Sequence, residues 1–237
     1  MSSYHVTMSR SDNPYHHGAL RAALIEATEA LLAERGPDAF SLREVARRAG
    51  VSPAAPTHHF GDAAGLLTAV ATLGFEALAH ALDAADAGAG GDAHAALRGQ
   101  GLAYVRFALD HPGRFRLMFR SGQLHADPLL AQHGAAAFEA LARAVRRASG
   151  VADATSMREP DWHAVTALWS LVHGYAHLAI AGRFDKLGGA DGLEAFVARS
   201  LTPIIDATLR GLFPDLLRPT KPPRGGRAAR RRSLPAS

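Results

Sequence analysis

The chain has no cysteine among its 237 residues. Disulfide bonds, thiolate metal sites and cysteine nucleophiles are therefore excluded. Aromatic residues are few, at 7% of the sequence, and no uninterrupted apolar run reaches the length of about 18 residues that a membrane-spanning helix needs. The first residues include histidines and lack the apolar segment of a signal peptide. These features predict a cytoplasmic protein with no membrane partner.

Motifs of the common enzyme classes are also missing. The sequence has no phosphate-binding P-loop, no Gly-x-Gly-x-x-Gly after a strand, no Gly-x-Ser-x-Gly and no His-Glu-x-x-His. No stretch shows the apolar-polar alternation of a strand, whereas alanine-rich segments with helical periodicity dominate the chain. We therefore expect an all-α protein that is not an enzyme and binds no cofactor.

Acidic residues are absent from the end of the chain. From Arg218 onward there are seven basic residues and no acidic one, which leaves 19 positive against 22 negative charges in the rest of the chain. The net charge of +4 thus comes from the tail. We expect this tail to be disordered, and the run from Arg224 to Arg232 could contact phosphates weakly.

The most informative stretch, SLREVARRAGVSPAAPTHHF, begins at Ser41. Ser41 stands three residues before Glu44, which is the spacing of a capping box, so a helix should begin here. Gly50 can adopt the left-handed conformation that ends a helix. Ser52 can then cap a second helix, and Pro53 suits its first turn. Two short helices joined by a tight turn form the unit that places a helix in the DNA major groove.

The same pattern fits two other interpretations. It could be a capped helical hairpin in a core, or part of a helical module that contacts another protein or senses a metal without recognising an operator. The surrounding sequence favours DNA binding, because from about Gly18 to Leu78 it resembles the DNA-binding domain of TetR-type transcriptional repressors. The residues that carry this resemblance are Glu34-Arg35-Gly36, Phe40, Ala49-Gly50-Val51-Ser52 and His59-Phe60.

The sequence departs from the family pattern at three places. Thr57 stands where the family commonly has a tyrosine, and Pro56 replaces a branched aliphatic residue. Because proline disfavours the α conformation in the residue before it, we expect an irregular first turn around Ala55. The family's lysine at the start of the fourth helix has no counterpart in the segment 62–65.

The resemblance implies that the second helix, at 52–59, enters the major groove. Ala54, Ala55 and His58 would lie closest to the bases, while Ser41, Thr57 and the arginines would mostly hold phosphates. The candidate DNA-binding residues are Ser41, Arg43, Arg47, Arg48, Ser52, Pro53, Ala54, Ala55, Thr57, His58 and His59.

Helical periodicity continues to the end of the second domain. Asp62 can cap a long helix that runs through Asp86, and further helices are predicted at 93–110, 113–120, 127–148, 159–183 and 190–212. We divide the chain into a flexible arm (1–17), a helix-turn-helix DNA-binding domain (18–78, with the motif at 41–60), a helical effector-binding and dimerisation domain (79–217) and a disordered basic tail (218–237).

The second domain carries a further resemblance. Trp169 and His173-Gly174, together with the segment 115–119, are similar to the regulatory domain of a TetR subgroup named after its Trp and His-Gly residues. This likeness covers roughly 90–212 and implies a pocket for a small-molecule effector, whose aromatic walls suit a largely apolar compound. The candidate pocket residues are Phe107, Phe115, Met118, Phe119, Phe138, Trp169, His173, Tyr175 and His177.

Two predicted helices, 161–183 and 190–212, are apolar over much of their surface. A helix of this kind must be covered on more than one side. A symmetric four-helix contact between two copies would cover both, and a C₂ dimer suits a palindromic operator. The candidate interface residues are Leu168, Leu171, Leu178, Val197, Leu201, Ile205 and Leu209.

Thirteen histidines raise the possibility of a metal site. His173 and His177 are four residues apart on one predicted helix, a spacing that lets two imidazoles bind one ion. His125, His133, His163 or Asp161 could complete such a site, but ordinary hydrogen-bonded histidines are the simpler interpretation, and we predict no metal. The whole sequence therefore predicts a dimeric, sequence-specific DNA-binding transcriptional regulator, a repressor that a small-molecule effector releases from a palindromic operator.

Overall fold

The computed structural model describes residues 14–120, 122–151, 156–188 and 192–214, so the basic tail and most of the predicted arm lie outside it. Every regular element in these ranges is helical, which confirms the predicted all-α class. In chain order they are α1 (Pro14–Arg35), the short 3-10 helix η1 (Pro37–Ala39), α2 (Leu42–Arg48), α3 (Ala55–Phe60), α4 (Ala63–Gly88), α5 (Ala93–Asp110), α6 (Pro112–Met118), α7 (Pro128–Ala148), α8 (Glu159–Ile180), α9 (Asp185–Gly188) and α10 (Gly192–Leu212).

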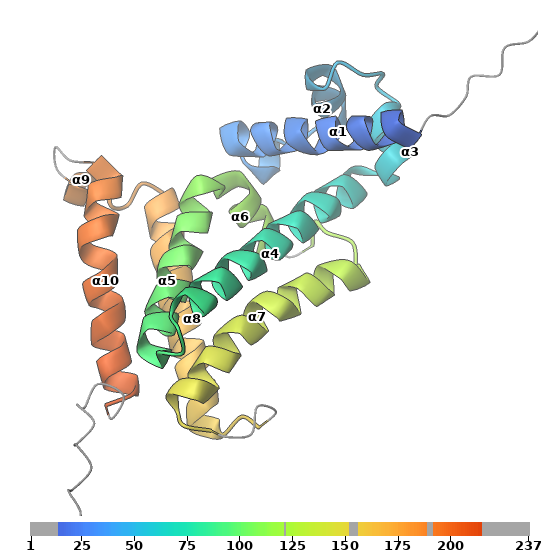
Figure 1. Cartoon of the computed structure of the whole chain (residues 1–237). Coiled ribbons are helices and arrows are strands. Elements are labelled where there is room, and N and C mark those ends of the chain that lie inside the picture. The colour runs from blue at the N-terminus through green and yellow to red at the C-terminus, as the bar shows by residue number, and fades with distance from the viewer. Residues whose placement is uncertain (1–13, 121, 152–155, 189–191, 215–237) are drawn as a thin grey trace, which may run out of the picture.

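The N-terminal part consists of α1, α2, α3 and the first turns of α4. Figure 1 shows α1 lying across the start of α4, with α2 and α3 beside it. Leu24 and Leu31 of α1 and Val45 of α2 are fully buried in a shared core. The guanidinium of Arg21 lies 5.3 Å from the ring centroid of Phe60, a cation–π contact that holds the end of α3 near α1. Helix α1 begins at Pro14, so residues 14–17 belong to it and not to the flexible arm (1–17) that the sequence predicts.

The central helix of the larger domain is α4, which packs against α5, α6 and α7. Its N-terminus is capped as predicted, because the Asp62 carboxylate accepts a hydrogen bond of 2.8 Å from the Gly65 amide. By length and composition α4 is apolar enough to cross a membrane, with a mean hydropathy of 1.4 in its most apolar window. However, 56% of that window is buried inside the protein, so its place in the core accounts for its composition.

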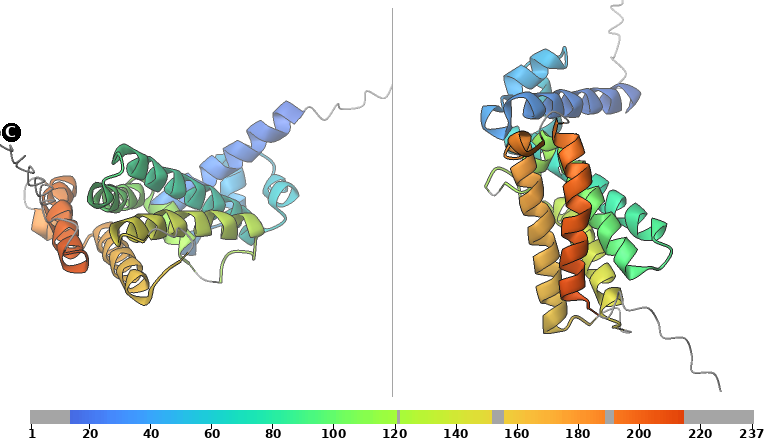
Figure 2. Two further views of the ribbon diagram at one scale, coloured as in Figure 1. Left: turned by 60° about the horizontal axis from the view of Figure 1, so that its bottom comes forward. Right: turned by 90° about the vertical axis from the view of Figure 1, so that its left-hand side faces the viewer.

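Helices α8 and α10 lie side by side on one face of the larger domain, as the right-hand view of Figure 2 shows. Three residues on the apolar face of α10, namely Leu201, Ile205 and Leu209, are at most 1% exposed and belong to the protomer's own core. The opposite faces of the two helices are open, and Leu178 of α8 and Ile204 of α10 are 48% and 37% exposed.

The larger domain meets the N-terminal part through α6. At Gly113, a Cβ atom would lie 2.5 Å from the carbonyl carbon of Leu32 and 2.6 Å from the amide nitrogen of Ala33. The backbones of α6 and α1 are therefore in direct contact, and only glycine fits at this position. The adjacent Arg114 forms an ion pair with Glu29 of α1, which fixes the same contact from the side.

We predict that Gly113→Ala destabilises the protein by about 1–3 kcal/mol, because the added methyl group forces α6 away from α1. Urea unfolding followed by circular dichroism measures this loss. Gly88→Ala at the end of α4 is the matched control, because its Cβ would meet no atom within 4 Å and the change should be neutral or slightly stabilising. Equal unfolding midpoints for the two variants would contradict the prediction.

Candidate DNA-binding surface and ligand cavity

The turn after α2 contains Gly50 in the left-handed conformation that the sequence predicts. Gly50 has a φ of 67°, its amide donates to the Arg47 carbonyl at 3.3 Å, and the Val51 amide donates to the Ala46 carbonyl at 3.0 Å. These two bonds are those of a Schellman motif, which ends a helix and reverses the chain direction. The sharp corner between the two short helices therefore depends on Gly50.

The predicted capping box at Ser41 was wrong. The Ser41 side chain makes no cap hydrogen bond, and the Glu44 carboxylate instead accepts hydrogen bonds from Arg47 at 2.8 Å and from Arg48 at 3.0 Å. Arg47 first, and then Arg48, lower the pKa of Glu44 to about 2. Both partners of these bonds are charged, and Arg47 binds both carboxylate oxygens at once, which a single backbone amide cannot do.

The Arg48 side chain joins two helices of the DNA-binding domain. Its two terminal nitrogens donate to both carboxylate oxygens of Glu34 at 2.8 and 2.6 Å, so it joins α2 to α1. Its side chain is only 17% exposed, compared with 71% for Arg47. Arg43 is exposed, and no ion pair joins it to another described residue. Of the three arginines predicted to contact phosphates, Arg43 is thus the freest.

The second helix of the motif starts later than predicted. Instead of beginning at Ser52, α3 begins at Ala55, and the preceding residues form a turn in which the Ala55 amide donates to the Ser52 carbonyl at 3.0 Å. Pro56 occupies the first turn of α3, where its missing N–H leaves no helical bond unmade. Pro56 is also buried, so it packs α3 onto the domain. Ala55, which precedes Pro56, is the first residue of α3, so the proline does not exclude it from the helix as expected.

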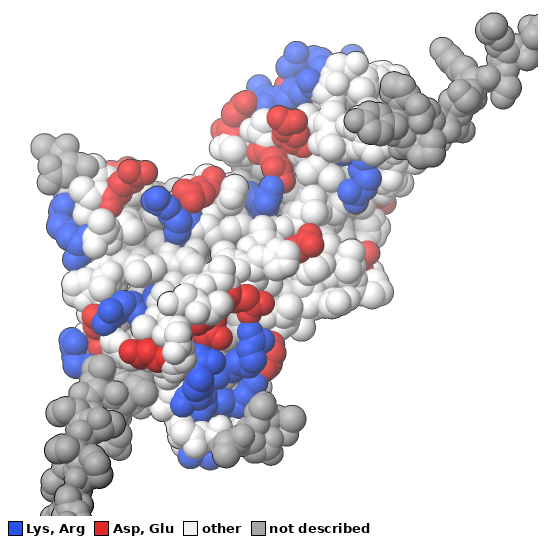
Figure 3. Space-filling model, viewed as in Figure 1, with Lys and Arg blue, Asp and Glu red and all other residues white. Residues whose placement is uncertain are grey.

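The candidate DNA-binding residues lie together on the surface of α2, α3 and their turn. Figure 3 shows basic side chains gathered at the end of the molecule that α2 forms, with acidic side chains beside them. Three members, Arg48, Ala55 and His59, are half-buried. The exposed members are Ser41, Arg43, Arg47, Ser52, Pro53, Ala54, Thr57 and His58.

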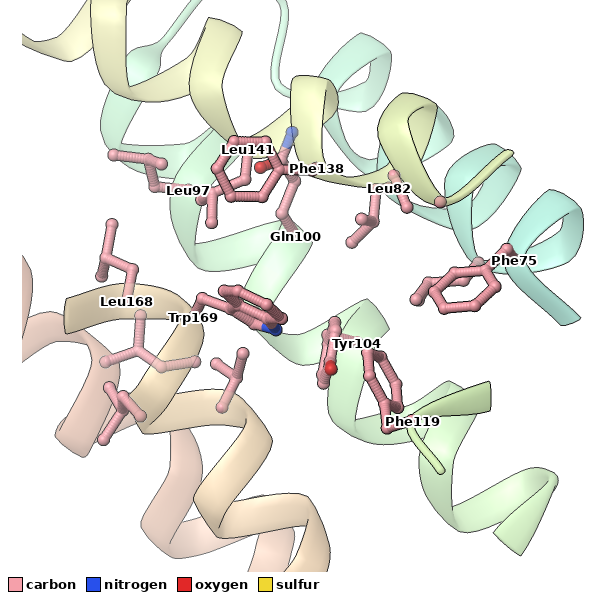
Figure 4. Close-up of a pocket in the computed structure, with 17 residues that line it drawn as sticks. Phe75, Leu82, Leu97, Gln100, Tyr104, Phe119, Phe138, Leu141, Leu168 and Trp169 are labelled. Atoms are coloured by element: carbon pink, nitrogen blue, oxygen red, sulfur yellow. The ribbon is translucent and has the colours of Figure 1, made fainter. Parts of the chain in front are cut away.

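A cavity of about 320 Å³ lies among α4, α5, α7, α8 and α10. Figure 4 shows side chains from these helices turned toward one another around it, with Phe75 and Phe119 toward one end and Trp169 between Leu168 and Tyr104. The residues that line it are Phe75, Leu78, Leu82, Leu97, Gln100, Gly101, Tyr104, Phe119, Gly134, Ala137, Phe138, Leu141, Leu168, Trp169, Leu171, Val172 and Ile205. Its volume is at the lower end of the range of about 300–1,000 Å³ for small-molecule sites.

Only three of the nine predicted pocket residues line this cavity: Phe119, Phe138 and Trp169. The other six lie outside this cavity, because aromatic composition does not show which way a helix face points. Four of them, Phe107, Phe115, Met118 and Tyr175, are buried in the core instead. The remaining two, His173 and His177, pack on the Phe115 ring with centroid distances of 5.5 and 5.3 Å.

The predicted dimer interface needs a similar correction. Leu168, Leu171 and Ile205 line the cavity, while Leu201 and Leu209 are buried within the protomer. These residues face inward because α8 and α10 pack on α5 as well as on each other. Of the seven candidates, Leu178 is exposed and Val197 is half-buried.

Most of the cavity wall was missed from the sequence. Residues such as Leu78, Leu97 and Val172 follow the ordinary helical periodicity of a core, so no sequence signal separates a cavity wall from a packed interior. Gln100 is the exception. It interrupts the apolar stripe of α5 and is only 2% exposed, and a buried amide in such a stripe is a signal that could have been noticed.

The polar groups near the cavity are uncharged. The Tyr104 hydroxyl lies 2.8 Å from Nδ1 of His173, and burial raises the pKa of Tyr104. Burial, and to a lesser extent the neighbouring His177, lower the pKa of His173. Both groups are therefore held in their neutral forms at neutral pH.

The residues considered for a metal site do not converge. Nε2 of His125 lies 2.8 Å from the Asp62 carboxylate, Nε2 of His163 is near Glu159, and Asp161 is bound to Arg158. In the described ranges, no group of three His, Cys, Asp or Glu side chains is placed to hold an ion. The geometry therefore gives no support to a metal-sensing module.

The folded chain thus combines an exposed helix-turn-helix with a separate helical domain that encloses an apolar cavity, the organisation of a DNA-binding regulator. Residues 24–70 match the family model described as bacterial regulatory proteins, tetR family, and residues 97–203 match the tetracyclin repressor-like C-terminal domain. The two matches cover well over half of the chain. The chain therefore belongs to the TetR family of transcriptional regulators.

Solved structures share the fold of this chain. A protein of unknown function from Rhodococcus sp. RHA1 is 35% identical, covers 85% of this chain and 100% of its own, and has a TM-score of 0.67. The TetR family regulator PfmR from Thermus thermophilus is 23% identical over 79% of this chain and 97% of its own, with a TM-score of 0.60. RolR in complex with resorcinol is 23% identical over 87% and 97%, with a TM-score of 0.50. No curated protein sequence matches the chain.

The lowered pKa of His173 leads to a prediction about stability and pH. Its pKa in the folded protein lies below the ordinary value of 6.5, so the unfolded chain binds this proton more readily. The stability from His173 is therefore complete above about pH 6.5 and is lost as the pH falls through the folded pKa. The free energy of unfolding is measured with urea at about pH 7.5 and again at about pH 5.5. Between these two pH values it should fall less for His173→Gln than for the unaltered protein.

A pH dependence of His173→Gln equal to that of the unaltered protein would contradict the prediction.

Proposed function

We propose that the protein is a homodimeric repressor that binds a palindromic operator and releases it when a small, largely apolar effector enters the cavity. The observation that carries this proposal is that one short helix, α6, touches both the cavity and the DNA-binding domain. Phe119, at the end of α6, lines the cavity, while Gly113, at its start, lies against α1.

For DNA recognition we propose that α3 enters the major groove with its N-terminal end foremost. Ala54, Ala55 and His58 would approach the bases, because the two alanines are small enough for close approach. The other predicted contacts would hold phosphates and fix the position of α3. These are Ser41, Arg43, Arg47, Ser52, Thr57 and His59, whereas Pro53, which has no hydrogen-bond donor, would only pack beside the DNA backbone. Arg48 would act indirectly, since its bonds to Glu34 hold α2 in place.

For dimerisation we propose that the outer faces of α8 and α10 meet their symmetry mates. Leu178 and Ile204 are large apolar side chains exposed on these faces. At Gly174 of α8 and Gly211 of α10, an added Cβ would meet no atom within 4 Å, so the partner helices could approach closely. A C₂ dimer would present two α3 helices to successive major grooves.

The path from cavity to DNA-binding domain would run through α6. Arg114 forms an ion pair with Glu29 of α1, and Arg120, just after α6, forms one with Asp38 of η1. An effector that displaces Phe119 would move these contacts together. It would favour a conformation in which the two α3 helices are wrongly spaced, to the extent that it binds that conformation more tightly.

Three further features belong to the proposal. The protein would act in the cytoplasm, where operator DNA is found, and without catalysis.

The RolR complex shows that a protein of similar fold holds a small aromatic compound, which supports an effector role for the cavity. The competing interpretation, a helical module that binds only other proteins, requires that no duplex DNA is selected.

The test is a binding selection from random duplex oligonucleotides with the purified full chain, followed by affinity measurements on the selected operator. We expect a palindromic operator that binds two copies of the chain. Arg43→Ala and Thr57→Ala should each weaken the operator by about tenfold, because each removes a phosphate contact.

Arg143→Ala is the matched control for Arg43→Ala. It removes the same charge from an exposed position on α7, where Arg143 pairs with Asp83, and it should leave operator affinity unchanged. Failure to select any duplex, or equal affinities for all three variants and the unaltered protein, would disprove the DNA-binding surface.

A further inference from the structure

The cavity wall carries no charge. Among its described lining residues there is no Asp, Glu, Lys or Arg, and the polar side chains are Gln100, Tyr104 and Trp169. A charged ligand would lose its hydration here without gaining a counter-ion, which is strongly unfavourable in an apolar site. The occupant of the cavity must therefore be uncharged, or lose its charge on entry.

The size of the cavity limits the occupant further. An apolar protein cavity of about 150 Å³ is enough for benzene. At about 320 Å³, this cavity has room for a molecule of about two rings. Its walls are mostly leucine, valine and aromatic side chains, so most of the surface of such a molecule would be buried against hydrocarbon.

One polar atom in the wall lacks a partner. Gln100 donates from Nε2 to the Ala140 carbonyl oxygen at 3.1 Å, and its Oε1 is buried without any hydrogen bond. Four buried side-chain atoms in the described ranges are in this condition, and only this one belongs to a cavity-lining residue. An unmatched buried acceptor is unfavourable, so a ligand that displaces the atoms now covering Oε1 and supplies a donor gains by satisfying it.

The orientation of the Gln100 amide is fixed by its neighbour. Rotating the amide by half a turn would bring Oε1 against the Ala140 carbonyl oxygen, placing two acceptors face to face. The nitrogen must therefore face Ala140, and the oxygen is left over. The unpaired group is thus an acceptor, and its complement is a hydrogen-bond donor.

The other polar groups of the wall already have partners. The Tyr104 hydroxyl is hydrogen-bonded with Nδ1 of His173 at 2.8 Å, and the neighbouring Trp169 side chain offsets part of the rise that burial causes in the pKa of Tyr104. A ligand therefore meets one unfilled polar requirement in an otherwise apolar space, and that requirement is at Gln100.

We propose that the cavity selects an uncharged, mostly hydrocarbon molecule of about two rings with a single hydrogen-bond donor, such as a hydroxyl group, that donates to Oε1 of Gln100. This inference rests on the proposed function, because it concerns the cavity assigned to the effector. It adds the chemical class of that effector and the residue that recognises it.

The test is isothermal titration calorimetry of the full chain, without DNA, with three probes that share one ring system. 2-Naphthol is uncharged and has a donor, 2-methoxynaphthalene has the oxygen but no donor, and 2-naphthoate is charged. We expect 2-naphthol to bind about 3- to 10-fold more tightly than 2-methoxynaphthalene, as one net hydrogen bond provides, and 2-naphthoate to bind weakest.

Substitution of Gln100 tests the recognising residue. Gln100→Leu removes the acceptor, so this variant should bind 2-naphthol and 2-methoxynaphthalene with about the same affinity. Gln100→Met, with an unbranched side chain of similar length, is the second variant if the leucine is not accommodated. Leu141→Val in the same wall is the control, and it should weaken both probes by the same factor, because it removes only apolar contact.

The proposal is overturned if none of the probes binds, if 2-methoxynaphthalene or 2-naphthoate binds as tightly as 2-naphthol, or if the preference survives in a folded Gln100 variant. These outcomes are separate from failure of the proposed function. Selective binding of 2-naphthol without release of the selected operator would leave this inference intact and would contradict effector-controlled repression.

Discussion

At Gly113 the backbone of α6 lies against the backbone of α1, with no room for a Cβ atom between them. A backbone contact cannot adjust by changing a rotamer, so α6 and α1 must move together. The ion pairs from Arg114 to Glu29 and from Arg120 to Asp38 extend this contact over the whole length of α6. Phe119, the residue that follows α6, lies in the cavity wall, so this arrangement supports the proposed coupling between the cavity and α1.

The cavity itself is a departure from normal packing. Protein interiors rarely leave voids larger than a water molecule, yet here Gly134 stands in the cavity wall where an added Cβ would meet only Phe75 Cδ1, at 4.0 Å. An empty apolar void of this size lowers stability, because the lining atoms lose their contacts. A ligand that fills the void restores these contacts, which gives it the binding energy needed to shift the protein between two conformations.

The sequence was sufficient to predict the fold class, the order of the helices and the corner at Gly50, because these depend on local periodicity and on one conformational requirement. It predicted the Ser41 cap wrongly, because the carboxylate of Glu44 had two arginines within reach that a linear pattern does not rank. It also assigned Ile205 to a dimer interface, although this residue lines the cavity. Whether an apolar stripe faces a core, a void or a partner is decided by tertiary packing, which periodicity does not contain.

The most direct test of the proposed link between cavity and DNA-binding domain is a distance between the two α3 helices of the proposed dimer. Because the chain has no cysteine, Ser52→Cys provides a single exposed site for a spin label. Gly134→Phe fills the cavity without a ligand, since its Cβ would meet only Phe75 Cδ1, at 4.0 Å. We predict that the label-to-label distance measured by pulsed electron paramagnetic resonance changes in the Gly134→Phe protein, together with loss of operator affinity. An unchanged distance and unchanged affinity would contradict the account.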